Sequence, residues 1–210
     1  MTPDQIRACF TQPDGRFLFA RFADPVATLA LGLGGERERA LAAALKAAAA
    51  DWGLPVASED GSDAGASLMI VGVETWDDLL ELPGLVDAGA LGSTAALVRD
   101  LTERDRVALR RFGRDDEGDG RLQQVVSFQR LGSHVGQKPA DRFAEVELFL
   151  CALRWSAGVW ANPVTDAGGH LLPHLVALVR AAYRPEMPNS STDPSLADRL
   201  AAAMADEVRR

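Results

Sequence analysis

The chain has 210 residues, a formal net charge of −8 and a hydrophobic content of 47%, which is enough for one domain with a large core. The negative charge argues against nucleic acid and against an anionic membrane surface, because both attract clustered Lys and Arg. The sequence lacks an apolar run of about 18 residues that would cross a membrane, and its start, MTPDQIRACF, lacks the features of a signal peptide. We therefore expect a cytoplasmic protein, and a processed secreted form stays open.

The first part of the sequence indicates strands around one long helix. A turn and a short aromatic strand are expected in Asp14–Phe22, and a stronger strand in Pro25–Leu33, where a proline at the start is tolerated. A helix spans about Glu36–Trp52, with leucines on one face. A short strand is expected at Pro55–Glu59. The continuous apolar run Ala66–Val73 is typical of a strand buried on both faces.

The middle of the chain predicts a β-hairpin. A threonine N-cap with an aspartate three residues later opens a short helix over Thr75–Leu82, and Leu85–Leu101 is weakly helical. Apolar and polar residues alternate in Arg106–Gly113, which favours a half-buried strand. Residues 114–120 form a turn rich in Asp and Gly, and Arg121–Leu131 returns as the second strand.

Three helices are expected in the last part of the chain. The segment Ala140–Ala157 repeats apolar residues at steps of three and four over a wide face, which indicates a central buried helix. A second helix is expected at Pro173–Tyr183, and a third after Asp193, an N-cap that precedes a proline. We predict a single layered α+β domain over residues 1–188, with a mixed sheet covered by helices, and a C-terminal helix in residues 189–210 packed on it.

Cys9 and Cys151 are the two cysteines, and they lie far apart without metal-ligand spacing. Free cysteines are often buried, so two buried thiols are expected. A disulfide between them stays open if the protein works in an oxidising compartment.

A glycine-rich turn joins the second expected strand to the long helix in the stretch LALGLGGERER, and such turns bind phosphate in many nucleotide-binding proteins. A dinucleotide fingerprint needs a third glycine where Arg37 stands, and a phosphate loop of the Walker type needs a Gly-Lys pair. Glu36 and Glu38 complement the helix N-terminus and would repel phosphate. We interpret the turn as structural, with an anion site as the alternative, and expect no cofactor.

The acidic turn residues Asp115, Asp116, Glu117 and Asp119 resemble the opening of a calcium-binding loop. The last ligand of such a loop is a bidentate glutamate, and Val126 stands at that position. A solvated hairpin turn explains the run better, because Asp and Gly favour turns.

The three histidines, His134, His170 and His174, are the candidates for chemistry. His170 and His174 have the spacing of two helical metal ligands, but Pro173 places the first of them before the helix, and the motif lacks a glutamate. His134 follows Ser133 in a glycine-rich loop that does not form the nucleophile elbow of a serine hydrolase. Loop and cap positions are the ordinary interpretation of all three histidines, so we predict no metal site.

The order of these elements, with the segments RFADPVATLALGL, GASLMIVGV, QQVVSFQRL and LVALVRAAYRPEMP, resembles a bacterial family of unknown function with a zincin-like (metalloprotease-like) fold. The resemblance covers Arg21–Pro188. It includes a terminal Leu/Tyr-x-Pro signature, matched here by Ala182-Tyr183-Arg184-Pro185. In zincins the central helix carries a histidine pair and a glutamate base, and in this family polar residues replace them. The resemblance therefore implies a zincin-like scaffold without its metal.

The corresponding helix in this chain reads EVELFLCALRWSAG, from Glu145 to Gly158. Its expected inner face offers Cys151 and Trp155, and an apolar face cannot bind zinc or activate water. Glu145 and Glu147 are two residues apart, so they do not share a helix face or form a catalytic carboxylate pair. We expect metalloprotease chemistry to be absent, and keep Cys151 and Trp155 as candidate pocket residues.

These observations favour a non-catalytic binding or scaffold protein that captures a peptide along a sheet edge. The expected hairpin would present Arg110, Arg111, Gln123 and Gln124 beside apolar residues. A protein or peptide partner is therefore expected, with no nucleic acid and no membrane, and the oligomeric state is open.

Two alternatives stay open. An enzyme with a small-molecule pocket would use His134, His170 or His174, and it would need two of these histidines in one cleft. A subunit of a hetero-complex is suggested by the fairly apolar region Leu82–Leu101, whose exposure would mark a partner surface.

Overall fold

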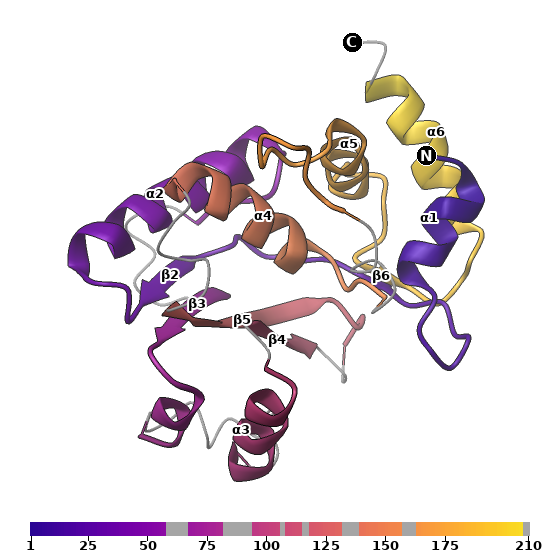
Figure 1. The fold of residues 1–210 in the computed structure, drawn as a ribbon. Coiled ribbons are helices and arrows are strands. Elements are labelled where there is room, and N and C mark those ends of the chain that lie inside the picture. Colours follow the sequence, from indigo (N-terminus) through magenta and orange to yellow (C-terminus); the bar gives the residue numbers. More distant parts are fainter. Residues whose placement is uncertain are drawn as a thin grey trace.

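A mixed four-stranded sheet forms the centre of the structure, a computed structural model that describes residues 1–57, 67–81, 94–105, 108–114, 118–131, 139–156 and 163–207 (Figure 1). The strands of the sheet are β2 (Thr28–Leu31), β3 (Leu68–Val73), β4 (Ala108–Arg114) and β5 (Leu122–Arg130). They lie in the order β2-β3-β5-β4. The first three run parallel to one another, and β4 is antiparallel to β5 at one edge.

Helices pack on one face of this sheet and extend beyond its end. Helices α2 (Gly35–Asp51) and α4 (Ala140–Ala152) lie side by side over the sheet, and α5 (Pro173–Ala182) packs against α4 (Figure 1). Helix α6 (Leu196–Glu207) contacts both α5 and the N-terminal helix α1 (Pro3–Phe10). A small second sheet pairs β1 (Phe19–Ala20) with β6 (Ser190–Ser191). The arrangement confirms the predicted α+β class in one layered domain.

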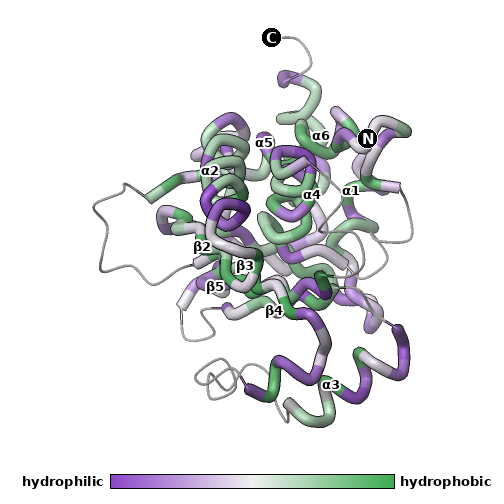
Figure 2. Tube along the Cα trace, turned by 60° about the vertical axis from the view of Figure 1, so that its left-hand side comes forward, coloured by the Kyte–Doolittle hydropathy of each residue, from purple (hydrophilic) through white to green (hydrophobic). Residues whose placement is uncertain are grey.

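The opposite face of the sheet is covered by α3 (Thr94–Glu103) and the 3-10 helix η1 (Trp76–Glu81). In Figure 2, α3 alternates between hydrophilic and hydrophobic colours, as expected of a helix with one buried face. Its Val98 and Leu101 join a second apolar cluster with residues of β3 and β5. Because β3 also contributes Leu68 and Ile70 to the main core, the prediction that this strand is buried on both faces is confirmed.

Helix α1 is absent from the sequence-based expectations, although its start carries a capping box. The Thr2 hydroxyl accepts the Gln5 N–H at 3.3 Å, and the Gln5 side-chain oxygen accepts the Thr2 N–H at 2.8 Å. Pro3 occupies the first turn, where its missing N–H is harmless. The local signal for this helix was therefore present in the sequence.

Helix α4 ends at Ala152, so the predicted end at Ala157 is wrong. The chain becomes extended at Leu153, which forms a β-bridge with Arg21. The next N–H, of Arg154, donates to the carbonyl oxygen of Ala20 at 2.9 Å. Pairing with the β1 segment thus takes the backbone out of the helix, although the apolar pattern continues.

The other boundaries differ less from the predictions. The hairpin of β4 and β5 is confirmed, with β4 beginning at Ala108. The expected strand Pro55–Glu59 is reduced to a single bridge between Val26 and Val56. Helix α3 begins at Thr94, within the region expected to be weakly helical. Residues 82–93 lie outside the described residues.

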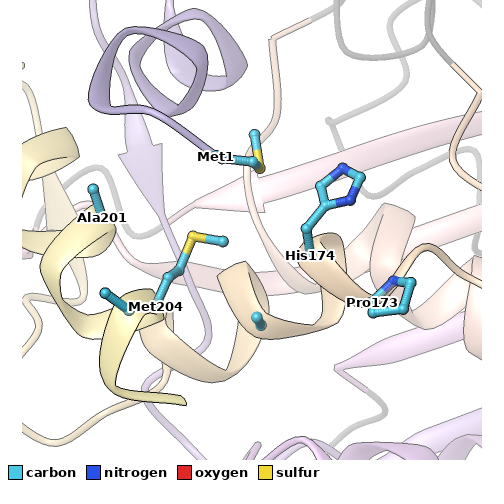
Figure 3. Close-up of a pocket in the computed structure, with 7 residues that line it drawn as sticks. Met1, Pro173, His174, Ala201 and Met204 are labelled. Carbon is cyan, nitrogen blue, oxygen red and sulfur yellow. The ribbon is translucent and has the colours of Figure 1, made fainter. Parts of the chain in front are cut away.

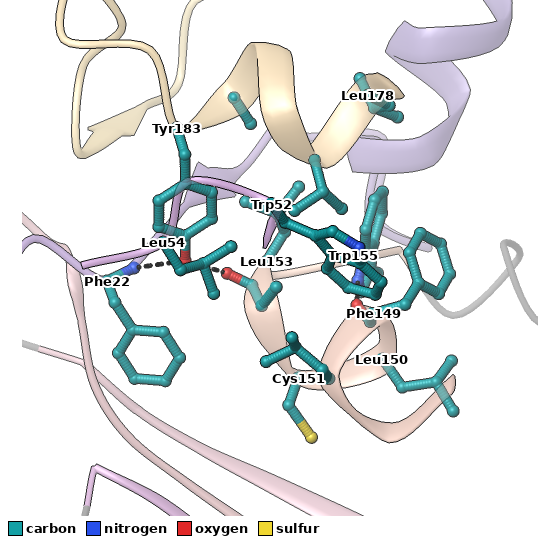
Figure 4. Packing of buried hydrophobic residues seen from close by; sticks show 14 of the residues in the cluster. Phe22, Trp52, Leu54, Phe149, Leu150, Cys151, Leu153, Trp155, Leu178 and Tyr183 are labelled. Atoms are coloured by element: carbon teal, nitrogen blue, oxygen red, sulfur yellow. Dashed lines mark hydrogen bonds between the residues drawn. The ribbon is translucent and has the colours of Figure 1, made fainter. Parts of the chain in front are cut away.

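The Tyr183 hydroxyl joins three segments of the core. It accepts the N–H of Phe22 at 3.2 Å and donates to the carbonyl of Ala152 at 2.7 Å (Figure 4). The buried Arg21 guanidinium lies 5.5 Å from the centre of the Tyr183 ring. The Arg21 guanidinium also donates hydrogen bonds to the carbonyls of Ala182, Arg184 and Met187. The AYRP signature therefore has a structural role at the C-terminal end of α5.

Candidate functional site

A cluster of polar side chains is buried between α4 and the hairpin of β4 and β5. Arg110 and Ser127 are directly opposite each other in the register of the two strands, and Glu147 of α4 lies over them. Glu147 is 3% exposed. Arg110 donates to the two Glu147 carboxylate oxygens at 3.0 and 2.5 Å. The arrangement is a bidentate ion pair between a strand and the helix above it.

Two further side chains complete the hydrogen bonds of this cluster. The Ser127 hydroxyl donates to a Glu147 carboxylate oxygen at 3.0 Å, and it accepts from the Gln129 amide at 2.8 Å. Burial alone would lower the pKa of Arg110, but the charge and hydrogen bonds of Glu147 raise it above its ordinary value. Glu147 is thus neutralised by Arg110 and accepts three hydrogen bonds, which suits it to hold the sheet to α4.

Glu147 corrects the expectation that the inner face of α4 is apolar. It lies one helical turn before Cys151, so both face the hairpin. The available signal was this spacing of four residues, which places a carboxylate on the buried stripe. Burial raises the pKa of the Cys151 thiol, and the Glu147 charge raises it further, so the thiol stays protonated at neutral pH. A protonated, fully buried thiol is a poor nucleophile.

Cys151 of α4 and Trp155, which follows the helix, are the candidate pocket residues, and both lie in the apolar core (Figure 4). Trp155 is 3% exposed, and its ring nitrogen donates to the carbonyl of Phe149 at 2.8 Å. Its ring stacks on Phe10 with centroids 5.3 Å apart. Cys151 is buried and is a free thiol, as is Cys9. The predicted pair of buried free thiols is therefore confirmed.

Of the two histidines that the structure describes, His174 lines the hollow described below and His170 does not. His134 lies outside the described residues. His170 is exposed in a turn, where its backbone N–H donates to the Asp166 carboxylate at 2.9 Å. His174 stands in the first turn of α5. Among the described residues, no group of three or more His, Cys, Asp or Glu is placed to hold a metal ion.

His174 lines a hollow of about 530 Å³ between α5, α6 and the first residue (Figure 3). The other lining residues are mostly apolar: Met1, Pro173, Ala177, Ala201, Met204 and Ala205. Burial lowers the pKa of His174, and the positive charge of the chain's amino group lowers it further. The imidazole is therefore neutral at pH 7, beside an apolar wall.

The outer edge of β4 is the second feature of interest. Along its seven residues β4 pairs with β5 on one side, and no strand in the described part of the chain pairs with the other side. Gln123 and Gln124 of β5 are exposed, as expected. Arg110, in contrast, is held by Glu147 and is not presented to solvent as the sequence suggests. The side chain of Arg111 lies outside the described residues.

The glycine corner after β2 is occupied by the chain itself. The Glu38 carboxylate accepts the Leu33 N–H at 3.1 Å. Gly32 has φ +74° and packs so closely that a β-carbon would overlap the Gly72 carbonyl oxygen. A carboxylate therefore stands where a phosphate would need a backbone donor, and Gly32 has a packing reason to be glycine.

The acidic turn of the hairpin is described at Asp119 but not at residues 115–117. The Asp119 carboxylate accepts the Arg121 N–H at 3.1 Å and the Asn189 side-chain amide at 3.0 Å. The bond from Asn189, together with the bond that the Ser190 hydroxyl donates to the Asp119 backbone carbonyl, ties the hairpin to the β6 segment. The described part of the turn thus has a local structural role.

Comparisons with known proteins give no assignment: no family model matches the chain, and neither a curated protein nor a solved structure shows a significant match. Within the described residues, no helix has the length and apolar character needed to cross a bilayer.

Proposed function

We propose that this protein is a non-catalytic binding module that captures an extended peptide as an additional strand on the outer edge of β4. The observation that carries the proposal is the position of β4. It is a seven-residue strand at the end of the sheet, with an outer edge that is unpaired within the described residues. An unpaired edge presents a row of backbone donors and acceptors to which a peptide backbone can bind.

The opposite edge of the sheet is less suited to this role. Strand β2 has four residues. Just before it, the Val26 N–H donates to the Pro55 carbonyl, and the Val26 carbonyl accepts the Ala57 N–H. The segment at residues 55–57 therefore occupies the start of that edge already.

The buried ion pair supports the proposal because it fixes β4 to the rest of the domain. Arg110, in the middle of the strand, is bound to Glu147 of α4 through two hydrogen bonds. A strand held in place before binding loses less conformational entropy when a peptide pairs with it. The zincin-like scaffold stays part of the proposal on its sequence resemblance alone. Its lack of metal is supported by Glu147, because the inward carboxylate of α4 already has a protein partner.

A screen of short random peptides, displayed and selected against the purified protein, tests the proposal. Selected peptides are then synthesised with N-methyl groups at alternate residues. Strand addition uses every second peptide N–H, so one set of N-methyl positions should abolish binding and the other should be tolerated. Equal tolerance at all positions, or binding that needs a helical peptide, would overturn the proposal.

The hollow at His174 favours a second candidate, the binding of a small apolar molecule with one hydrogen-bonding group. Its volume of about 530 Å³ is within the usual range for ligand pockets. A fragment library screened by chemical shifts of the Met204 methyl group tests this candidate. Hits that lose affinity in His174→Ala support it, and hits that bind this variant equally well contradict it.

A further inference from the structure

Two half-buried arginines lie near the end of β4, one on the strand and one over the Phe112 ring, and neither has an acidic partner within the described residues. Arg154, in the extended segment after α4, places its guanidinium 4.9 Å from the centre of the Phe112 ring. Arg114 donates from its Nε to the Gly120 carbonyl at 3.1 Å. Neither guanidinium forms an ion pair with a carboxylate of the described residues.

The electrostatics of this pair differ from those of Arg110 and Arg184, two half-buried arginines that are bound to carboxylates. Arg110 is bound to Glu147, and Arg184 is bound to Glu207 at 2.6 Å. For Arg154, burial lowers the pKa, and the nearby charge of Arg114 lowers it further. Two like charges in a partly buried place favour the arrival of an anion, and guanidinium groups match carboxylates particularly well.

The position of the pair relates it to the edge of the sheet. Phe112 and Arg114 belong to β4 itself, and the Phe112 ring packs on the α4 side of the sheet under Arg154. A strand that pairs with β4 places one of its side chains about 5 Å from Phe112 on the same face. That side chain would be within reach of the Arg154 guanidinium.

We propose that Arg114 and Arg154 form a carboxylate-recognition site beside the edge of β4, so that the captured peptide carries Asp or Glu on the strand face that meets Phe112. The inference rests on the proposed function and specifies its partner as an acidic extended peptide. Charge also disfavours a second copy of the chain as the occupant. Antiparallel pairing of two β4 strands would bring arginines of one copy close to arginines of the other.

The test compares selected peptides with versions in which each Asp or Glu is replaced by Asn or Gln. We expect one acidic position to dominate, with about tenfold weaker binding when it is neutralised, as for hydrogen bonds to charged groups. Arg154→Gln should weaken binding of the acidic peptide to the same degree, and it should not weaken binding of the neutral peptide further. Arg114→Gln provides a second variant if Arg154→Gln fails to fold.

Arg180→Gln is the matched control, because it removes the same charge from an arginine of α5 that is bound to Asp51 at 2.6 Å. It should leave the affinity unchanged. If Arg154→Gln and Arg114→Gln bind both peptides as tightly as the original protein, the carboxylate site is wrong, while the N-methyl pattern still upholds peptide capture. If no selected peptide shows that pattern, peptide capture fails and the carboxylate site with it.

Discussion

The Glu147 carboxylate of α4 is buried against the hairpin of β4 and β5. It accepts two hydrogen bonds from Arg110 and one from Ser127. Moving both charges of such a pair out of water is unfavourable, and the pair is tolerated because each charge neutralises the other. Removal of one partner leaves the other charged in a site with little access to solvent.

Replacement of Glu147 by Gln should therefore lower the free energy of unfolding by about 3 kcal/mol, because the Arg110 charge loses its partner. Urea denaturation followed by circular dichroism measures the change. Glu145→Gln is the control on the same helix. Glu145 is half-buried, with Arg142 at 3.8 Å, and it should change stability by less than about 0.5 kcal/mol. Equal midpoints for the two variants would show that the pair does not hold α4 to the hairpin.

Tyr183→Phe tests the hydroxyl that joins Phe22 to Ala152. The substitution removes one oxygen and leaves a buried N–H and a buried carbonyl without that partner. We expect a loss of about 2 kcal/mol in the free energy of unfolding. Tyr183→Leu is the comparison variant, and its free energy of unfolding should fall further, because the ring is also removed. A Tyr183→Phe variant as stable as the original protein would refute this role.

The Cys9 thiol links stability to alkaline pH. Burial raises the pKa of Cys9 from 9.0 to about 11 in the folded chain. The unfolded chain therefore loses this proton first, and stability falls between pH 9 and 11. At pH 10 the thiol accounts for about 1.4 kcal/mol of that fall. Denaturation of Cys9→Ala at pH 8 and pH 10 should show a smaller fall than the original protein, and an identical fall would contradict the prediction.

Among the elements, the β2–α2 corner shows why glycine is required at one position and only preferred at another. Gly32 and Gly34 both have positive φ, at +74° and +84°. A β-carbon on Gly34 would meet no atom within 4 Å, whereas one on Gly32 would overlap the Gly72 carbonyl of the neighbouring strand β3. The first glycine therefore sets the distance between two strands, and the second sets the start of α2.

The two glycines can be separated by substitution. Gly34→Ala should lower the unfolding free energy by about 1 kcal/mol, from backbone strain alone. Gly32→Ala should cost about 2 kcal/mol more, because the new methyl group displaces β3. Thermal unfolding of the two variants in parallel measures the difference. If both are destabilised equally, the close approach of Gly32 to β3 is not what fixes this corner.

Elements with a strong apolar period were predictable from the sequence, and their ends were less so. The continuous run of β3 and the alternation of β4 indicate strands, because packing on the sheet requires those periods. The end of α4 depends on a β-bridge between Leu153 and Arg21, which are far apart in the sequence. Helix α1 shows the opposite case, since a capping box at Thr2 and Gln5 marks its start, while its 8 residues are too few for an apolar period to indicate a helix.

For the whole molecule, the sequence predicts a hairpin but not its place in the sheet. The position of β4 at an edge follows from the pairing of β5 with β3, which no local pattern contains. The spacing of Glu147 and Cys151 places the carboxylate on the buried face of α4, but no local pattern indicates its partner, because Arg110 and Glu147 are 37 residues apart on different elements. The candidate site therefore depends on tertiary packing, while the layered α+β class depends on local patterns.

The central claim is that the outer edge of β4 binds an extended peptide, and residue-resolved amide hydrogen exchange tests it most directly. A selected peptide is added at saturation, and exchange is followed by NMR along β4 and along β2, the strand at the other edge. The account predicts that alternate amides of Ala108–Arg114 become protected while those of Thr28–Leu31 are unchanged. Unchanged exchange along β4 with the peptide bound would contradict it.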